Sequence, residues 1–72
     1  EPLTNRELDV LQLLALRLTN KEIGHQLGIA TETVKQHSMN VFRKLNATNR
    51  RDAIVRARAL GFNLDGITAG HR

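Results

Sequence analysis

Residues 19–45 read TNKEIGHQLGIATETVKQHSMNVFRKL, and the spacing of a few residues in this stretch decides the fold. Thr19-x-x-Glu22 is a capping box, in which the threonine oxygen accepts a free backbone N–H and the glutamate accepts the N–H of the cap residue. Gly28 ends the short helix that follows, because only glycine enters the left-handed conformation of a helix C-cap without steric cost. This stretch therefore predicts a short helix and a tight turn.

A third helix begins within residues 30–32, where Thr31 has the better capping chemistry. Helical spacing predicts its inward face: Val34, Ser38, Val41 and Leu45. The short helix, the turn and the start of the third helix together carry the branched and small residues that two closely packed helices need: Ile23, Gly24, Leu27, Gly28, Ile29 and Val34. Glycine inside a helix costs about 1 kcal/mol relative to alanine, so Gly24 indicates close packing. A short helix, a glycine turn and a longer helix form a helix-turn-helix, a shape suited to the major groove of DNA.

One further helix precedes this motif and one follows it. Thr4-x-x-Glu7 is a second capping box, and it opens a helix whose buried stripe is predicted to run to its end: Leu8, Leu11, Ala15 and Leu18. Thr48 or Asn49 is available to cap a fourth helix, which Gly61 ends. This fourth helix is predicted to turn four residues inward: Ala53, Ile54, Ala57 and Leu60.

The pattern predicts an all-α, four-helix helix-turn-helix domain over residues 1–62 and a flexible tail over residues 63–72. A chain of 72 residues with 40% apolar content has room for one modest core, which excludes a two-domain enzyme. The chain has no cysteine and no run near the roughly 20 apolar residues of a membrane span, so we expect a cytoplasmic protein without a membrane partner. It begins with Glu1 rather than methionine, so we expect a piece of a longer protein.

The net charge of +4 is concentrated in the middle of the chain. Residues 19–51 carry six Lys or Arg against two Glu, whereas residues 1–18 carry two Arg against three acidic residues. A polyanion is the natural partner of a small basic domain, and nucleic acid is favoured over a membrane surface.

The outward face of the third helix carries side chains that can reach base edges. If the predicted inward face is correct, a rotation of about 100° per residue places six residues opposite it: Glu32, Lys35, Gln36, Met39, Asn40 and Arg43. Lysine can reach guanine acceptors, glutamine adenine, glutamate a cytosine amino group and methionine a thymine methyl. The alternative is an ordinary solvated helix face, and the preceding glycine turn favours DNA reading.

Two groups of residues are candidates for phosphate contacts. Thr19, Asn20 and Lys21 lie at a helix N-terminus, where unpaired N–H groups and the positive end of the dipole attract a phosphate oxygen. The second group is basic, and we expect it to hold phosphates as a group: Arg43, Lys44, Arg50 and Arg51.

The order of these motifs resembles the LuxR/FixJ/NarL family of bacterial DNA-binding domains over about residues 3–62. The motifs that carry the resemblance are Leu3-Thr4-x-Arg6-Glu7, Val10-Leu11, Leu18-Thr19-Asn20-Lys21-Glu22-Ile23, Thr33-Val34-Lys35-x-His37, Lys44-Leu45 and Arg50-x-x-Ala53. The resemblance implies a C-terminal domain of a bacterial transcriptional regulator, with the third helix (about residues 31–45) in the major groove of double-stranded DNA. Residues 1–4 and 50–53 are most similar to the large MalT-type regulators.

The resemblance also implies roles for single residues. Base contacts fall on Lys35, Gln36 and Met39. Backbone contacts fall near four residues: Lys21, Thr33, His37 and Asn40. Ala30 stands where a serine cap is frequent, Gly24 where alanine is usual and Met39 where the family often has a polar or basic residue. Two assignments stay open for Arg50, a phosphate contact or a pairing with Glu7 of the first helix.

The fourth helix is a candidate dimer interface. Val55 and Ala59 lie at i and i+4 spacing on the side opposite its inward residues. Small exposed apolar residues are ordinary, and harmless exposure is the alternative. The resemblance implies that this helix pairs two copies on DNA, with RNA polymerase as a further partner.

Other functions are less well supported by the sequence. His25, His37 and His71 have no cysteine and no repeated carboxylate at ligand spacing, so we expect no metal, no cofactor and no catalysis. A sigma-factor region-four domain is one alternative, but the stretch from Lys44-Leu45 to Arg50-x-x-Ala53 favours the LuxR type. A small helical protein-interaction module is the other, and it would show no salt-dependent affinity for DNA.

Overall fold

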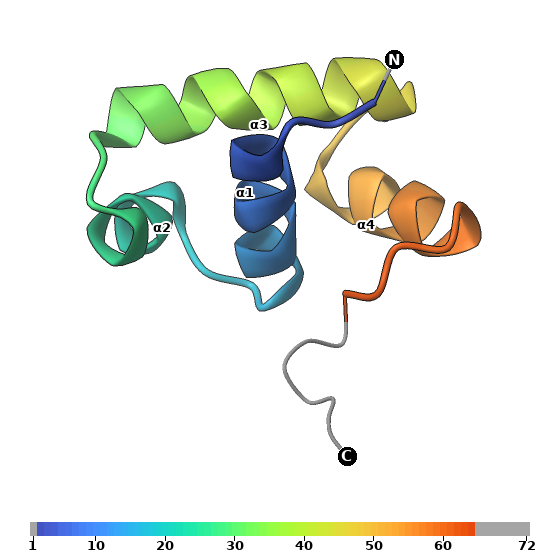
Figure 1. Ribbon diagram of the computed structural model, residues 1–72, viewed down its shortest axis with the longest axis horizontal. Helices are drawn as coiled ribbons and strands as arrows, with labels where there is room; N and C mark the ends of the chain where they lie inside the picture. The colour runs from blue at the N-terminus through green and yellow to red at the C-terminus, as the bar shows by residue number, and fades with distance from the viewer. Residues whose placement is uncertain (1, 65–72) are drawn as a thin grey trace.

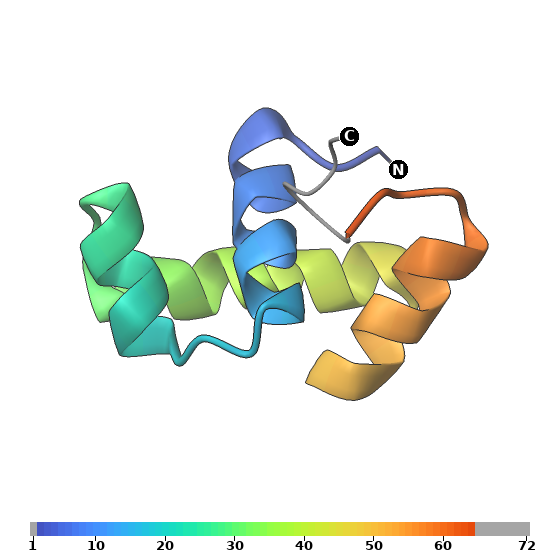
Figure 2. The same ribbon diagram turned by 90° about the horizontal axis from the view of Figure 1, so that it is seen from below.

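The computed structural model describes residues 2–64, which form four helices joined by short turns (Figure 1). Their bounds are Asn5–Ala15 for α1, Asn20–Leu27 for α2, Thr31–Leu45 for α3 and Arg50–Ala59 for α4. The long helix α3 runs across the molecule, α1 crosses it near its middle, and α2 and α4 lie toward its two ends (Figures 1 and 2). The predicted all-α helix-turn-helix fold is confirmed.

Helices α1 and α2 begin at the two predicted capping boxes. The Thr4 hydroxyl oxygen accepts the N–H of Glu7 at 3.1 Å, and the Glu7 carboxylate accepts the N–H of Thr4 at 3.0 Å. Thr19 and Glu22 make the same pair of hydrogen bonds at 3.1 and 2.7 Å. Each box satisfies two backbone N–H groups that the helix itself cannot pair.

The other two helices begin differently from each other. Asn49, one of the two predicted caps, accepts the N–H of Asp52 at 2.8 Å. Helix α3 has no side-chain cap, because Ala30 occupies the N-cap position. The prediction that Thr31 caps this helix is wrong: Thr31 is the first helical residue, one position too late for its hydroxyl to act as the cap.

Each helix is followed by a residue in the left-handed conformation. The sequence predicts Gly28 (φ 69°) and Gly61 (φ 95°), but Arg17 (φ 68°) and Asn46 (φ 57°) adopt the same conformation with side chains. The turn at Arg17 follows a helix that ends at Ala15, so the predicted stripe running through Leu18 is wrong. Because α1 contacts α2, α3 and α4, it buries a different set of four residues, of which the sequence predicts only Leu11: Glu7, Val10, Leu11 and Leu14.

The core has two parts, and α3 contributes to both. One part lies between α1, α3 and α4: Leu11, Val41, Leu45, Ala53, Ala57 and Leu64. The other lies between α1, α2 and α3: Val10, Leu14, Ile23 and Val34. Phe42 packs against both parts. The position of α3 is therefore fixed by the three other helices along its length.

The core continues past residue 62. Leu64 is 4% exposed and packs into the core, whereas Leu60, predicted to point inward, is 69% exposed. The reason is the turn after α4, where Gly61 is left-handed and the N–H of Phe62 donates to the carbonyl of Ala57 at 3.0 Å. This reversal brings Leu64 to the core in place of Leu60. The rest of the predicted tail, residues 65–72, lies outside the described residues.

Gly24 packs closely against the turn, as its place inside a helix indicates. A Cβ atom added there would lie 2.6 Å from the carbonyl oxygen of Ile29, which is closer than real Cβ contacts come. The obstacle is backbone and cannot swing aside. Gly24 therefore lets α2 and the start of α3 approach each other.

Candidate nucleic-acid interface

Helix α3 has a buried face and an exposed face, arranged as the sequence predicts. The four residues predicted to face inward are buried: Val34, Ser38, Val41 and Leu45. The opposite side is exposed at Glu32, Lys35, Gln36, Met39 and Arg43, with Asn40 half-buried. Met39 is 68% exposed, so a large apolar side chain is free to contact a partner. The three predicted base-contacting residues therefore share one accessible surface.

Lys35 has an intrahelical partner on this surface. Its Nζ lies 3.5 Å from a carboxylate oxygen of Glu32, and the two side chains are 54% and 85% exposed. An ion pair this exposed contributes about 0–1 kcal/mol, so a ligand can separate it at little cost.

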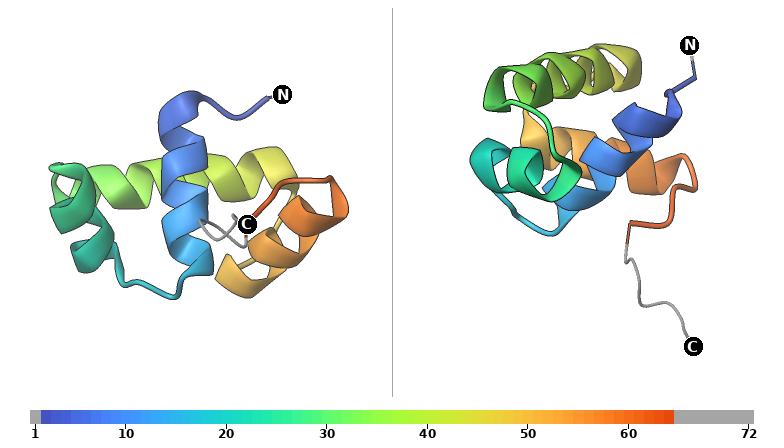
Figure 3. Two further views of the ribbon diagram at one scale, coloured as in Figure 1. Left: turned by 60° about the horizontal axis from the view of Figure 1, so that its bottom comes forward. Right: turned by 60° about the vertical axis from the view of Figure 1, so that its left-hand side comes forward.

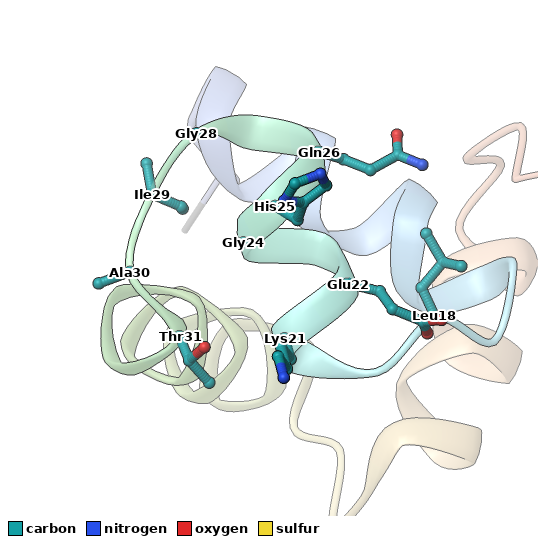
Figure 4. Close-up of a pocket in the computed structure, with 10 residues that line it drawn as sticks. All are labelled: Leu18, Lys21, Glu22, Gly24, His25, Gln26, Gly28, Ile29, Ala30 and Thr31. Carbon is teal, nitrogen blue, oxygen red and sulfur yellow. The ribbon is translucent and has the colours of Figure 1, made fainter.

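A hollow runs along the outer surface of α2 and its turn into α3 (Figure 4). Lys21, from the start of α2, and Thr31, from the start of α3, lie at one edge of it (Figure 4). Hydrogen bonds from Thr19, first from its backbone N–H, lower the pKa of Glu22 and keep this capping carboxylate ionised. Thr19 and Asn20 complete the end of the helix, where free backbone N–H groups favour an anion.

The N-terminal ends of α2 and α4 lie at the same edge of the molecule (Figure 2). Each end carries the positive pole of its helix. At the start of α4, the Arg56 side chain lowers the pKa of Asp52, with a further contribution from the Thr48 N–H. Arg50, the first residue of α4, is half-buried at this edge. Of the remaining predicted contacts, Thr33 is exposed and His37 is half-buried.

The prediction that Lys44 contacts a phosphate is wrong, because its side chain is buried in an ion pair. Its Nζ lies 2.7 Å from the Glu7 carboxylate and 3.3 Å from the carbonyl oxygen of Pro2, and its side chain is 8% exposed. The hydrogen bond from Lys44, followed by that from the Thr4 N–H, lowers the pKa of Glu7. Glu7 is thus paired with Lys44 and not with Arg50, which corrects the second expectation for Arg50.

Arg50 instead lies at a hollow lined by three arginines and one apolar residue: Arg17, Arg50, Arg51 and Ile54. No motif in the sequence indicates a role for Arg17. Arginine is not a typical turn residue, so the turn itself is not predicted either. The one available signal is a basic residue in the connection between α1 and α2. On the exposed side of α4, Val55 is 59% exposed and Ala59 is also exposed.

Among residues 2–64, no helix is long and apolar enough to cross a membrane. No three histidine or acidic side chains in this part of the chain gather where they could hold a metal ion.

A short helix, a close glycine turn and a longer helix with an exposed polar face define a helix-turn-helix DNA-binding domain. The profile of the bacterial regulatory proteins of the luxR family matches residues 1–57. The chain belongs to this family.

Relatives of known name agree with this assignment. The chain is 42% identical over 59 residues to the HTH-type transcriptional regulator MalT of Vibrio cholerae, covering 82% of this chain and 6% of that protein. It is 49% identical over 57 residues to the transcriptional regulatory protein LiaR of Bacillus subtilis, covering 79% of this chain and 27% of that protein. It is 51% identical over 53 residues to the nitrate/nitrite response regulator protein NarP of Escherichia coli, covering 74% of this chain and 25% of that protein. The chain thus spans only a small part of these relatives.

A solved structure shows the same fold. The transcription factor GerE superposes with a TM-score of 0.80 at 39% sequence identity, over 88% of this chain and 96% of that chain. The comparisons support a DNA-binding domain of a transcriptional regulator and favour it over a sigma-factor domain or an interaction module. They span both MalT and response regulators, so the MalT-type resemblance stays a prediction.

Proposed function

We propose that α3 enters the major groove of double-stranded DNA and that Lys35, Gln36 and Met39 contact bases. The observation that carries this proposal is the exposed face of α3, held by a core that fixes the helix along its length. Lysine and glutamine offer hydrogen bonds to purine edges, and Met39 offers an apolar contact to a thymine methyl. The function is binding, and no step of it requires catalysis or a cofactor.

Phosphate contacts lie on both sides of this helix in the proposed complex. The candidate residues are Thr19, Asn20, Lys21, Thr33, His37, Asn40, Arg43 and Arg50. The shared edge at which α2 and α4 begin supports this arrangement, because two positive helix ends can then meet the sugar-phosphate backbone (Figure 2). Val55 and Ala59 of α4 pair two copies on DNA. We further propose a cytoplasmic regulator with RNA polymerase as its protein partner.

Salt dependence tests DNA binding itself. Affinity for a labelled duplex is measured at several salt concentrations, and log affinity should fall linearly with log salt, with a slope of about 0.9 per neutralised phosphate. A slope equal to several phosphates supports the proposal. A flat response would instead favour a protein-interaction module.

Substitutions separate base contacts from phosphate contacts. A preferred site is first selected from random duplexes. Lys35→Ala and Gln36→Ala should then relax preference at particular base pairs, by about 1 to 3 kcal/mol for a bidentate contact. Lys21→Ala should weaken all sequences to the same extent. If all three variants lose affinity uniformly on matched and mismatched duplexes, the assigned base-contacting face is wrong.

A further inference from the structure

The basic side chains of residues 2–64 divide into those with partners and those without. Arg6 pairs with Asp9, Lys35 with Glu32, Lys44 with Glu7 and Arg56 with Asp52. Arg43 and Arg58 also have interaction partners. Within the described part of the chain, the lysine and arginine side chains that make no hydrogen bond or ion pair are Arg17, Lys21, Arg50 and Arg51.

These four residues lie at the edge of the molecule where α2 and α4 begin. Lys21 is the second residue of α2, and Arg50 and Arg51 are the first two residues of α4. Arg17 lies between α1 and α2, and the C-terminal end of α1 lies beside the start of α4 (Figure 3, left). The unpaired positive charge is therefore concentrated on one edge, although other basic residues occur over the whole domain.

Arg17, Arg50 and Arg51 share more than this edge, because all three line the same hollow. Its fourth lining residue is Ile54. Ile54 packs against the core cluster of α1, α3 and α4, so the apolar side of the hollow is held in place. Three arginines line this one hollow, and like charges that share a hollow repel one another unless an anion lies between them.

The backbone at Arg17 strengthens this argument. Arg17 is left-handed (φ 68°), a conformation that glycine adopts freely and a residue with a Cβ adopts under strain. Glycine would adopt this folded conformation with less strain than arginine. What arginine adds is a third positive charge in the lining of the hollow.

We propose that this hollow binds a phosphate group of the DNA backbone and that Arg17 is an additional phosphate-binding residue. The inference rests on the proposed function, because it assigns the phosphate to the duplex that α3 reads. Planar guanidinium groups donate paired hydrogen bonds to phosphate oxygens, which makes arginine well suited to such a site. The hollow extends the positive edge formed by the starts of α2 and α4.

Two substitutions of Arg17 test the site without a change of fold. Arg17→Gln removes the charge, and Arg17→Gly removes the whole side chain while relieving the left-handed strain. The matched control is Arg6→Gln, because Arg6 is an exposed arginine of α1 that pairs with Asp9. Duplex affinity is measured for each variant against log salt, and thermal unfolding is followed by circular dichroism.

Both Arg17 variants should bind duplex DNA about tenfold more weakly at 0.1 M salt, because a charge-assisted hydrogen bond is lost. Their salt slope should fall by about 1, on matched and mismatched duplexes alike. The Arg6 variant should keep the slope of the unaltered chain. Arg17→Gly should also unfold at a higher temperature, so its weaker binding cannot come from unfolding.

Combining Arg17→Gln with Arg50→Gln tests whether the two arginines share one phosphate. Sharing predicts that the double variant loses less affinity than the product of the two single losses. Strict multiplication of the losses would overturn the shared hollow. Arg17 variants with the slope of the Arg6 control would overturn the inference, whereas salt-independent binding by the unaltered chain would overturn the proposed function itself.

If inorganic phosphate raises the unfolding temperature of the unaltered chain while the Arg17 variants keep its duplex affinity, the hollow is a site for small anions. That result would also overturn the assignment to DNA.

Discussion

Arg17 and Asn46 end their helices in a conformation that a Cβ atom makes unfavourable. For most residues the left-handed conformation costs about 1–2 kcal/mol, and asparagine tolerates it better. Glycine removes this cost, but it also gives the unfolded chain more conformational freedom. That freedom lowers the free energy of unfolding by about 0.5–1 kcal/mol. Arg17→Gly should therefore raise the free energy of unfolding by about 1 kcal/mol, and Asn46→Gly by less. Urea unfolding checks both, and a loss of stability in the Arg17 variant would contradict the strain.

Ser38 places a hydroxyl group in the core without a partner. It is 6% exposed, and its Oγ has no hydrogen-bond partner among the described residues. Ser38→Ala should raise the free energy of unfolding by about 1 kcal/mol, because it removes an unsatisfied polar group and improves helix propensity. Thr33→Ala, an exposed change in the same helix, is the control for propensity alone. Equal gains in the two variants would show that the buried hydroxyl costs nothing.

At the scale of the helices, the sequence predicts what depends on neighbours a few residues apart. Capping boxes join residues three apart, so Thr4 and Thr19 are visible in the sequence, and so is the cap at Asn49. Periodicity finds the two faces of α3 for the same reason. It cannot show where the chain reverses, and the left-handed turn at Arg17 therefore passes unnoticed. For the same reason, periodicity places Leu60 in the core, whereas the chain reverses after α4 and Leu64 is buried instead.

The Glu7–Lys44 pair lies beyond such patterns, because it joins residues 37 apart. It connects α1 with the end of α3, and both side chains are buried. Lys44→Met should lower the free energy of unfolding by about 3 kcal/mol at neutral pH, since a buried carboxylate loses its partner. Adding Glu7→Gln should restore part of this loss. A double variant no more stable than Lys44→Met would contradict the explanation.

The same pair makes stability depend on pH. The pKa of Glu7 is lowered in the folded state, so its contribution is complete above the pKa of the unfolded chain, about 4.3, and is lost as the pH falls through the folded value. The pKa values of Glu22 and Asp52 are also lowered, and both act in the same direction. Unfolding free energies measured from pH 7 to pH 3 should decrease. The difference between the unaltered chain and Lys44→Met should shrink over this range, and a constant difference would contradict the ion pair.

At the scale of the whole molecule, the sequence locates the base-contacting face better than the charged edge. A surplus of Lys and Arg in residues 19–51 indicates a polyanion, and the two faces of α3 follow from its spacing. A count of charges cannot show that Lys44 forms an ion pair with Glu7 or that Arg17 and Arg50 line the same hollow. Those facts depend on how α1, α3 and α4 pack together. The positive edge is therefore a property of the fold.

The charge of α4 also bears on the proposed dimer. This helix contains four arginines and one aspartate, so two copies brought together through α4 repel each other in solution. DNA phosphates neutralise part of that charge. Val55 and Ala59 form a small patch that offsets little of the entropy of association. We therefore expect the free domain to be monomeric and to pair on DNA, with half-sites related by a two-fold axis about one helical turn apart.

Val55→Glu tests this pairing. Val55 is 59% exposed, so the substitution should change the free energy of unfolding by no more than about 0.5 kcal/mol. Affinity for a duplex with one half-site should stay close to that of the unaltered chain, because Val55 is not among the proposed DNA contacts. On a duplex with two half-sites, two buried carboxylates would face each other across the pair, and cooperative binding should disappear. Gln12→Glu, which adds the same charge to an exposed position of α1, should leave cooperativity intact. Equal cooperativity in the unaltered chain and in Val55→Glu would place the contact between copies outside this face of α4.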